Sequence, residues 1–371
     1  MSAGNGASAG DGRNIDVRVG TLSGEGSQQR VPADRPGSDG APHFAVWDKS
    51  PYERDGRATY YDRPVVKEPV WIWTVPAYFW AGGAAGAAAV LAETVRLAGG
   101  DELRGLAGRA RWIAGVCAPL GVGLLVADLG RPERFLNMMR VFRRTSPMSV
   151  GSWILGTAAP ASAAAALFET RSNGLPSILG RATGLVSGLL GAPLAGYTGV
   201  LIANTAVPIW QAGRRSLPGL FMASGVSSAG SLLQLTGGGD AERQTARLFA
   251  AAGQAGELVG GAAFEREAGG VATVAKPLHE GLSGTLWKAT KALTASALAL
   301  NVVPGRSRLK GLAAGALGTL GALSLRFAVF HAGKSSARDP RATFDNQRSG
   351  RGAAEVTGTA AVTGAGGRRA T

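Results

Sequence analysis

The stretch that decides the fold class is ATGLVSGLLGAPLAGYTGVLIANTAVPIWQAG, residues 182–213. Its 32 residues include no Asp, Glu, Lys or Arg. A helix needs about 20 consecutive, mostly apolar residues to cross the hydrocarbon core of a bilayer. The stretch therefore predicts a membrane-spanning helix, and similar stretches lie on both sides of it.

Seven more stretches qualify as spans or come close. Four contain no charged residue: 69–92, 112–127, 145–168 and 216–239. Three weaker ones contain or border charged residues: 245–264, 289–303 and 311–331. We therefore expect an all-α integral membrane protein, a bundle of about eight transmembrane helices with disordered polar tails. An even number of crossings puts both termini on the same side of the membrane.

Composition supports a membrane protein and argues against several other classes. Hydrophobic residues make up 45% of the chain and charged residues only 17%, whereas soluble domains have about 25% charged residues. The net charge of +14 does not indicate nucleic-acid binding, because the basic residues lie at the ends of apolar stretches, as in membrane proteins. One cysteine, Cys117, and three histidines are too few for a cluster or a bis-histidine haem within the membrane. We expect no haem and no iron–sulfur cluster in this chain.

The stretches divide the chain into four parts. Residues 1–42 are rich in Gly, Ser, Ala and Asp and predict a disordered tail. Residues 43–69 contain aromatic residues and prolines, which fits either an ordered arm on a partner or the membrane surface, or a juxtamembrane linker. Residues 70–333 form the transmembrane domain, and 334–371 form a polar C-terminal tail.

Two of the loops and several helix ends carry distinctive motifs. The richest block contains DLGRP at 128–132, RFLNM at 134–138 and SPMS at 146–149. Phe135, Met138, Met139 and Phe142 follow helical spacing, so we expect a short amphipathic helix in the interface plane. Supporting motifs lie elsewhere: YTGVL at 197–201, NTAVPIW at 204–210, KPLHEG at 276–281, RFAVF at 326–330 and SARDP at 336–340.

Together these motifs resemble the NrfD / polysulfide-reductase membrane-subunit (PsrC-like) family over roughly residues 60–345. The arm around RPVVK, residues 63–67, is similar to that of actinobacterial members. The resemblance implies a membrane subunit that exchanges electrons with a quinone such as menaquinone and holds no cofactor of its own. The implied partners are a ferredoxin-like iron–sulfur subunit and a molybdopterin oxidoreductase catalytic subunit.

A quinone-reactive site must hydrogen-bond the quinone carbonyls and exchange protons with water. Tyr197 lies in the middle of the 182–213 stretch, where its hydroxyl needs a partner, and Tyr78 is a second candidate on the first helix. Asp128 and Arg131, three positions apart at the end of the second helix, are candidates for quinone or proton chemistry. The alternatives are an ordinary packed tyrosine and a loop clasp without a role in catalysis.

Other charged residues fall within or beside the apolar stretches. Glu257 and Arg326 lie at membrane depth, where charges are costly and usually functional. They predict either a proton relay or a buried ion pair. Glu93 and Arg96 predict an interfacial i,i+3 pair.

The leading hypothesis is a quinone-reactive membrane anchor subunit of an oxidoreductase complex in the cell membrane. The alternatives are a transporter of a small solute or ion and an anchor that only tethers a soluble partner. The loops do not decide the orientation, but the basic residues next to the first and last helices place both termini in the cytoplasm. These residues are Arg54, Arg57, Arg63, Lys67, Lys334, Arg338 and Arg341.

Overall fold

The computed structural model describes residues 64–129, 132–169, 174–305 and 307–348, which form helices and connecting segments without a strand. This confirms the all-α prediction. In chain order the first helices are α1 (Thr74–Ala98), η3 (Asp101–Leu103), α2 (Arg104–Asp128), η4 (Pro132–Met139), α3 (Pro147–Phe168), α4 (Gly174–Ala203) and α5 (Pro208–Ala212). They are followed by α6 (Leu217–Thr236), α7 (Asp240–Ala268), α8 (Ala272–Ala275), η5 (Lys276–Leu278), α9 (Gly281–Val302), α10 (Arg308–Arg338) and α11 (Pro340–Arg348).

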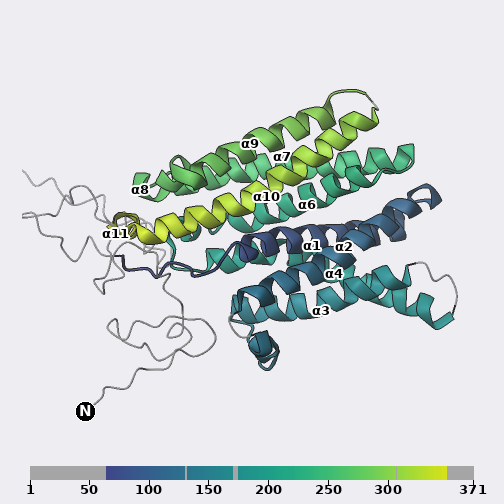
Figure 1. The fold of residues 1–371 in the computed structure, drawn as a ribbon, viewed down its shortest axis with the longest axis horizontal. Helices are drawn as coiled ribbons and strands as arrows, with labels where there is room; N and C mark the ends of the chain where they lie inside the picture. Colours follow the sequence, from purple (N-terminus) through teal and green to yellow (C-terminus); the bar gives the residue numbers. More distant parts are fainter. Residues whose placement is uncertain (1–63, 130–131, 170–173, 306, 349–371) are drawn as a thin grey trace, which may run out of the picture.

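Within the described residues, eight helices have 20 residues or more, and they run side by side in two groups of four. Figure 1 shows α1, α2, α3 and α4 in one group and α6, α7, α9 and α10 in the other. Helix α1 packs against α2 and α4 of its own group and against α6 of the second. Helix α4 also packs against α6, so the two groups join along α1, α4 and α6.

Glycines allow α1 to approach its neighbours this closely. A Cβ at Gly86 of α1 would lie 2.4 Å from the carbonyl oxygen of Gly191 in α4. A Cβ at Gly225 of α6 would lie 2.7 Å from the carbonyl oxygen of Gly83, again in α1. Small residues at helix crossings let backbones come together, which is how helices associate in lipid.

Five helical segments of the described part are long and apolar enough to cross a membrane, so the predicted count of about eight spans is not confirmed. The five are α1, η3 with α2, α3, α4 and α10. Helices α6, α7 and α9 are long enough but less apolar. Serines such as Ser224 and Ser228 lower the mean hydropathy of α6, and the charged residues Arg247 and Glu257 lower that of α7.

The 182–213 stretch is not one helix. Helix α4 begins earlier, at Gly174, and ends at Ala203, and α5 begins only at Pro208. Val207 is extended, at φ −68° and ψ 120°, as expected for a residue before proline. Asn204 and Thr205 turn their side chains back onto the carbonyls of Val200 and Ile202, at 2.8 and 2.7 Å. These contacts compete with the next helical turn.

The connector between α2 and α3 also differs from the prediction. It forms the 3₁₀ helix η4, which ends before Phe142, so the four apolar residues do not share one α-helical face. A 3₁₀ helix has three residues per turn, which brings the side chains of Phe135 and Met138 onto the same face. Phe142 instead packs edge-on against Trp153 of α3, at a ring-centroid distance of 6.1 Å.

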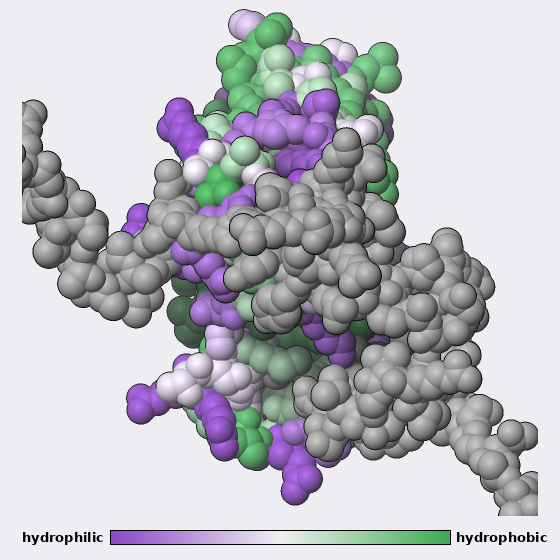
Figure 2. Space-filling view, turned by 90° about the vertical axis from the view of Figure 1, so that its left-hand side faces the viewer, coloured by the Kyte–Doolittle hydropathy of each residue, from purple (hydrophilic) through white to green (hydrophobic). Residues whose placement is uncertain are grey.

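One end of the bundle collects the start of α1, the end of α10 and the short helices η4, α8 and α11 (Figure 1). Thr74 and Arg338 therefore lie on the same side, and helices α5, α8 and α11 contact one another there. Figure 2 looks onto this end, where hydrophilic residues gather across the face beside hydrophobic ones at its upper margin. We call it the terminal end. The predicted tail at 1–42 and most of the arm at 43–69 lie outside the described residues.

Candidate functional site

Tyr78 and Tyr197, both predicted quinone contacts, meet inside the first group of helices. Tyr78 in the first turns of α1 and Tyr197 in α4 join through their hydroxyl groups. Tyr78 is only 1% exposed. The Tyr197 ring lies directly over Gly151 of α3, where a Cβ would be 2.0 Å from the ring, and the Tyr78 ring packs against Gly121 of α2. Four helices thus hold the two hydroxyls in one place.

Asp128 holds the segment that leads into α1. Its Oδ1 accepts a hydrogen bond from the backbone N–H of Ile72, at 3.0 Å. The carboxylate is partly buried at the end of α2, so the second and first helices are tied together just before Tyr78. Arg131, its predicted partner, lies outside the described residues.

Glu257 and Arg326 do not form the direct ion pair that the sequence suggested as one possibility. Arg326 donates from Nη2 to the carbonyl of Phe221, at 2.7 Å, and its guanidinium lies 3.8 Å from the centroid of the Phe221 ring. The Glu257 Oε1 accepts from the hydroxyl of Thr294, at 2.7 Å. Both residues are almost fully buried, and each retains polar atoms without a hydrogen-bond partner in the described part of the chain: Nε and Nη1 of Arg326 and Oε2 of Glu257.

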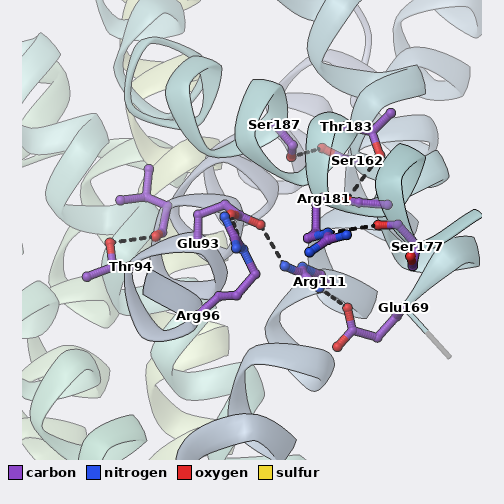
Figure 3. A network of polar contacts seen from close by, with 12 residues as sticks. Glu93, Thr94, Arg96, Arg111, Ser162, Glu169, Ser177, Arg181, Thr183 and Ser187 are labelled. Carbon is purple, nitrogen blue, oxygen red and sulfur yellow. Dashed lines mark hydrogen bonds and ion pairs between the residues drawn. The ribbon is translucent and has the colours of Figure 1, made fainter. Parts of the chain in front are cut away.

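Figure 3 shows a second charged cluster, which sequence reasoning found only in part. It lies where α1 ends and α2 begins, away from the terminal end. The predicted pair is confirmed: the Arg96 Nε lies 2.6 Å from the Glu93 Oε2. Arg111 of α2 adds an ion pair to the Glu93 Oε1, at 2.8 Å, and another to Glu169 just beyond α3. The side chains of Arg111 and Glu93 are 11% and 6% exposed.

Gly184 and Gly188 lie four residues apart in α4, a spacing that lets helices pack closely in lipid. A Cβ at Gly184 would lie 2.4 Å from the Glu93 Oε1, and one at Gly188 would lie 2.6 Å from its Cγ. The two glycines therefore make room for a buried carboxylate as well as for a helix.

The terminal end is fastened by contacts between residues far apart in the sequence. Trp210 of α5 donates from Nε1 to the carbonyl of Val329, at 2.8 Å, and stacks on Trp71 with ring centroids 6.1 Å apart. Arg338 makes two hydrogen bonds of 2.7 Å to the carboxylate of Glu68. Burial raises the pKa of Asp339. The Asp339 carboxylate also accepts a hydrogen bond from the backbone N–H of Arg341 in the first turn of α11, which acts on the pKa in the opposite direction but is the smaller effect.

A family model described as polysulphide reductase, NrfD, matches residues 64–335. The chain belongs to the NrfD family. This confirms the resemblance found in the sequence, apart from the actinobacterial subtype, to which the match does not extend. A search of curated proteins found no match.

Membership of the NrfD family indicates the kind of complex in which the contacts described above occur. NrfD proteins are membrane subunits of reductase complexes, in which they accompany iron–sulfur and molybdopterin subunits. With five helical segments able to cross a membrane, the chain is a multi-pass membrane protein. The family motifs also acquire structural roles. Ser336 in SARDP accepts from the N–H of Ile209 in NTAVPIW, at 3.2 Å, so two motifs join at the terminal end.

The described residues contain no group of three or more His, Cys, Asp or Glu side chains placed to hold a metal ion. The polar groups brought together are instead phenols, carboxylates, guanidinium groups and hydroxyls. Phenol hydroxyls donate hydrogen bonds and carboxylates exchange protons.

Proposed function

We propose that this NrfD protein is the quinone-reactive membrane subunit of a multisubunit oxidoreductase. It exchanges electrons between a quinone, such as menaquinone, and a docked ferredoxin-like iron–sulfur subunit that serves a molybdopterin-type catalytic subunit. The observation that carries the proposal is the meeting of the Tyr78 and Tyr197 hydroxyls within the first group of helices. A quinone carbonyl that enters between the two phenols accepts from both.

The reaction takes up two electrons and two protons for each quinone reduced to quinol. The electrons come from, or go to, the iron–sulfur partner. The two tyrosines orient the carbonyl oxygen by hydrogen bonding. In this proposal Asp128, which is partly exposed at the end of α2, exchanges protons with water near the membrane surface.

The terminal end offers the surface on which the iron–sulfur subunit docks. A groove of about 470 Å³ runs between residues 65–71 and the segment that carries Val207 and Trp210. Two of its lining side chains, Val65 and Val70, are exposed, and the connector between α2 and α3 exposes Leu136, Val141 and Phe142. Exposed apolar groups beside polar ones are typical of protein interaction sites.

We expect Tyr197→Phe and Tyr78→Phe each to raise the apparent KM for quinol up to about tenfold in the purified complex, because each removes one hydrogen bond worth about 1 kcal/mol. Steady-state quinol oxidation measures this. The matched control is Thr198→Val, which removes a buried hydroxyl next to Tyr197 that has no hydrogen-bond partner among the residues that the structure describes. Unchanged KM values in both tyrosine variants would show that the tyrosines only pack.

Amide replacements separate the chemical role of the carboxylates from their structural role. In Asp128→Asn the amide oxygen keeps the contact to Ile72, and in Glu257→Gln it keeps the contact to Thr294, but neither variant can carry a proton. We expect Asp128→Asn to lower quinone turnover by about tenfold or more while the complex stays assembled. The same loss in Glu257→Gln would identify a proton relay, whereas normal turnover with unchanged assembly would identify a structural clasp.

A further inference from the structure

A cavity of about 340 Å³ opens at the end of the second group opposite the terminal end. It lies between α6, α7, α9 and α10, close to where α7 and α10 begin. Figure 1 shows this end on the right, with the loop between α9 and α10. The quinone site proposed above lies in the other group of helices, so the cavity is a separate feature.

Four basic side chains and one acidic side chain line the cavity: Arg243, Arg247, Arg308, Lys310 and Asp240. Arg243 is neutralised by Asp240. Arg247 donates to the carbonyls of Asn301, Val302 and Val303, and Lys310 donates to those of Val303 and Pro304. Carbonyl groups are neutral, so both cations keep their charge.

Arg308 has no hydrogen-bond or ion-pair partner among the described residues. Three positive charges, those of Arg247, Arg308 and Lys310, therefore face one cavity without a counter-charge. The first turns of α7 and α10 add the positive ends of two helix dipoles. Such a cavity attracts an anion, and guanidinium groups are suited to phosphate oxygens.

The floor of the cavity also favours a ligand that can donate a hydrogen bond. Gln234 donates to Asn301, at 2.6 Å, and Asn301 donates onward to Gln254, at 3.0 Å. In this arrangement the Oε1 of Gln234 is buried without a hydrogen-bond partner within the described ranges. A carbonyl oxygen at the floor accepts from a hydroxyl, so a ligand with both a phosphate and a hydroxyl fits the cavity.

The surroundings of the cavity identify the ligand as a lipid. Leu309 and Val302, at the ends of the helices that form it, are 78% and 65% exposed. In a membrane these side chains contact acyl chains, whereas a soluble phosphate compound has no apolar part that would contact them. A basic pocket beside a membrane-spanning helix such as α10 is suited to an anionic lipid headgroup.

We propose that this cavity binds the headgroup of an anionic phospholipid that carries hydroxyl groups. The phosphate lies against Arg308, Lys310 and Arg247, and a headgroup hydroxyl donates to Gln234. The proposal does not depend on quinone chemistry, because it involves none of the residues assigned to the quinone site.

Delipidated full-length protein in detergent, titrated with single lipids and followed by native mass spectrometry, tests the proposal. Phosphatidylglycerol should bind at least tenfold more tightly than phosphatidylcholine, which has no net charge. Phosphatidylmethanol, which has the same charge but no headgroup hydroxyl, should bind about fivefold more weakly than phosphatidylglycerol. Equal binding of phosphatidylglycerol and phosphatidylcholine would overturn the proposal, and displacement of phosphatidylglycerol by millimolar inorganic phosphate would show a site for the free anion instead.

Charge-matched variants locate the site. Arg308→Gln with Lys310→Gln should weaken phosphatidylglycerol binding about thirtyfold, because each cation contributes about five- to sixfold. The control, Arg104→Gln with Arg181→Gln, removes two exposed cations from the same end but outside the cavity. A similar loss in the control would mean that lipid binds by the general positive charge of this end, and would overturn the assignment to the cavity.

Discussion

Arg111→Met should lower the free energy of unfolding by about 3–5 kcal/mol, the cost of leaving buried charges without their partner. Arg111 joins Glu93 of α1 and Glu169 after α3 through one guanidinium group. Its removal leaves Glu93 with Arg96 alone and leaves Glu169 without its ion pair to Arg111. Chemical denaturation in detergent, followed by tryptophan fluorescence, measures the loss.

Two further variants show whether charge burial causes this effect. Arg104→Met breaks an ion pair with Asp101 in which both side chains are more than three-quarters exposed, so we expect a change of about 1 kcal/mol or less. Adding Glu93→Gln and Glu169→Gln to Arg111→Met should recover part of the stability, because the unpaired charges are then gone. Equal losses for Arg111→Met and Arg104→Met would contradict the burial argument.

Gly86→Val should destabilise the protein by about 3 kcal/mol or more, because overpacking a rigid contact forces the backbone to move. The new Cβ would meet the Gly191 carbonyl oxygen at 2.4 Å and the Ala195 amide nitrogen at 2.7 Å. Both are backbone atoms, so no side-chain rotation relieves the clash. We also expect quinol oxidation to fall, since separating α1 from α4 pulls Tyr78 away from Tyr197.

The matched control is Gly123→Val, in the neighbouring helix α2. Gly123 is exposed, and a Cβ there would have no atom within 4 Å. Both changes introduce the same residue into a helix, so propensity cancels between them. The yield of monodisperse protein and its thermal midpoint in detergent provide the comparison. If Gly123→Val is as damaging as Gly86→Val, helix propensity and not the α1–α4 contact limits stability.

The candidate site could be predicted only residue by residue. Tyr78 and Tyr197 were selected separately, each as a polar group inside an apolar stretch, and nothing in the sequence placed them together. The reverse holds for Glu257 and Arg326. Two opposite charges at membrane depth suggested a pair, but they bind Thr294 and Phe221 instead. Residue type indicates that a buried group needs a partner, without indicating which partner the packing supplies.

The long apolar stretches by themselves determined that the chain is helical and embedded in a membrane, because backbone groups in lipid must bond within their own helix. The motifs by themselves determined the family. Only the tertiary structure decided that Gly184 and Gly188 make room for Glu93, and that Arg111 joins two helices and the segment after α3. The physical reason is that helix formation in lipid depends on local composition, whereas buried polar partners depend on which helix faces meet. Those faces are set by close contacts such as that of Gly86 with Gly191, between residues far apart in the chain.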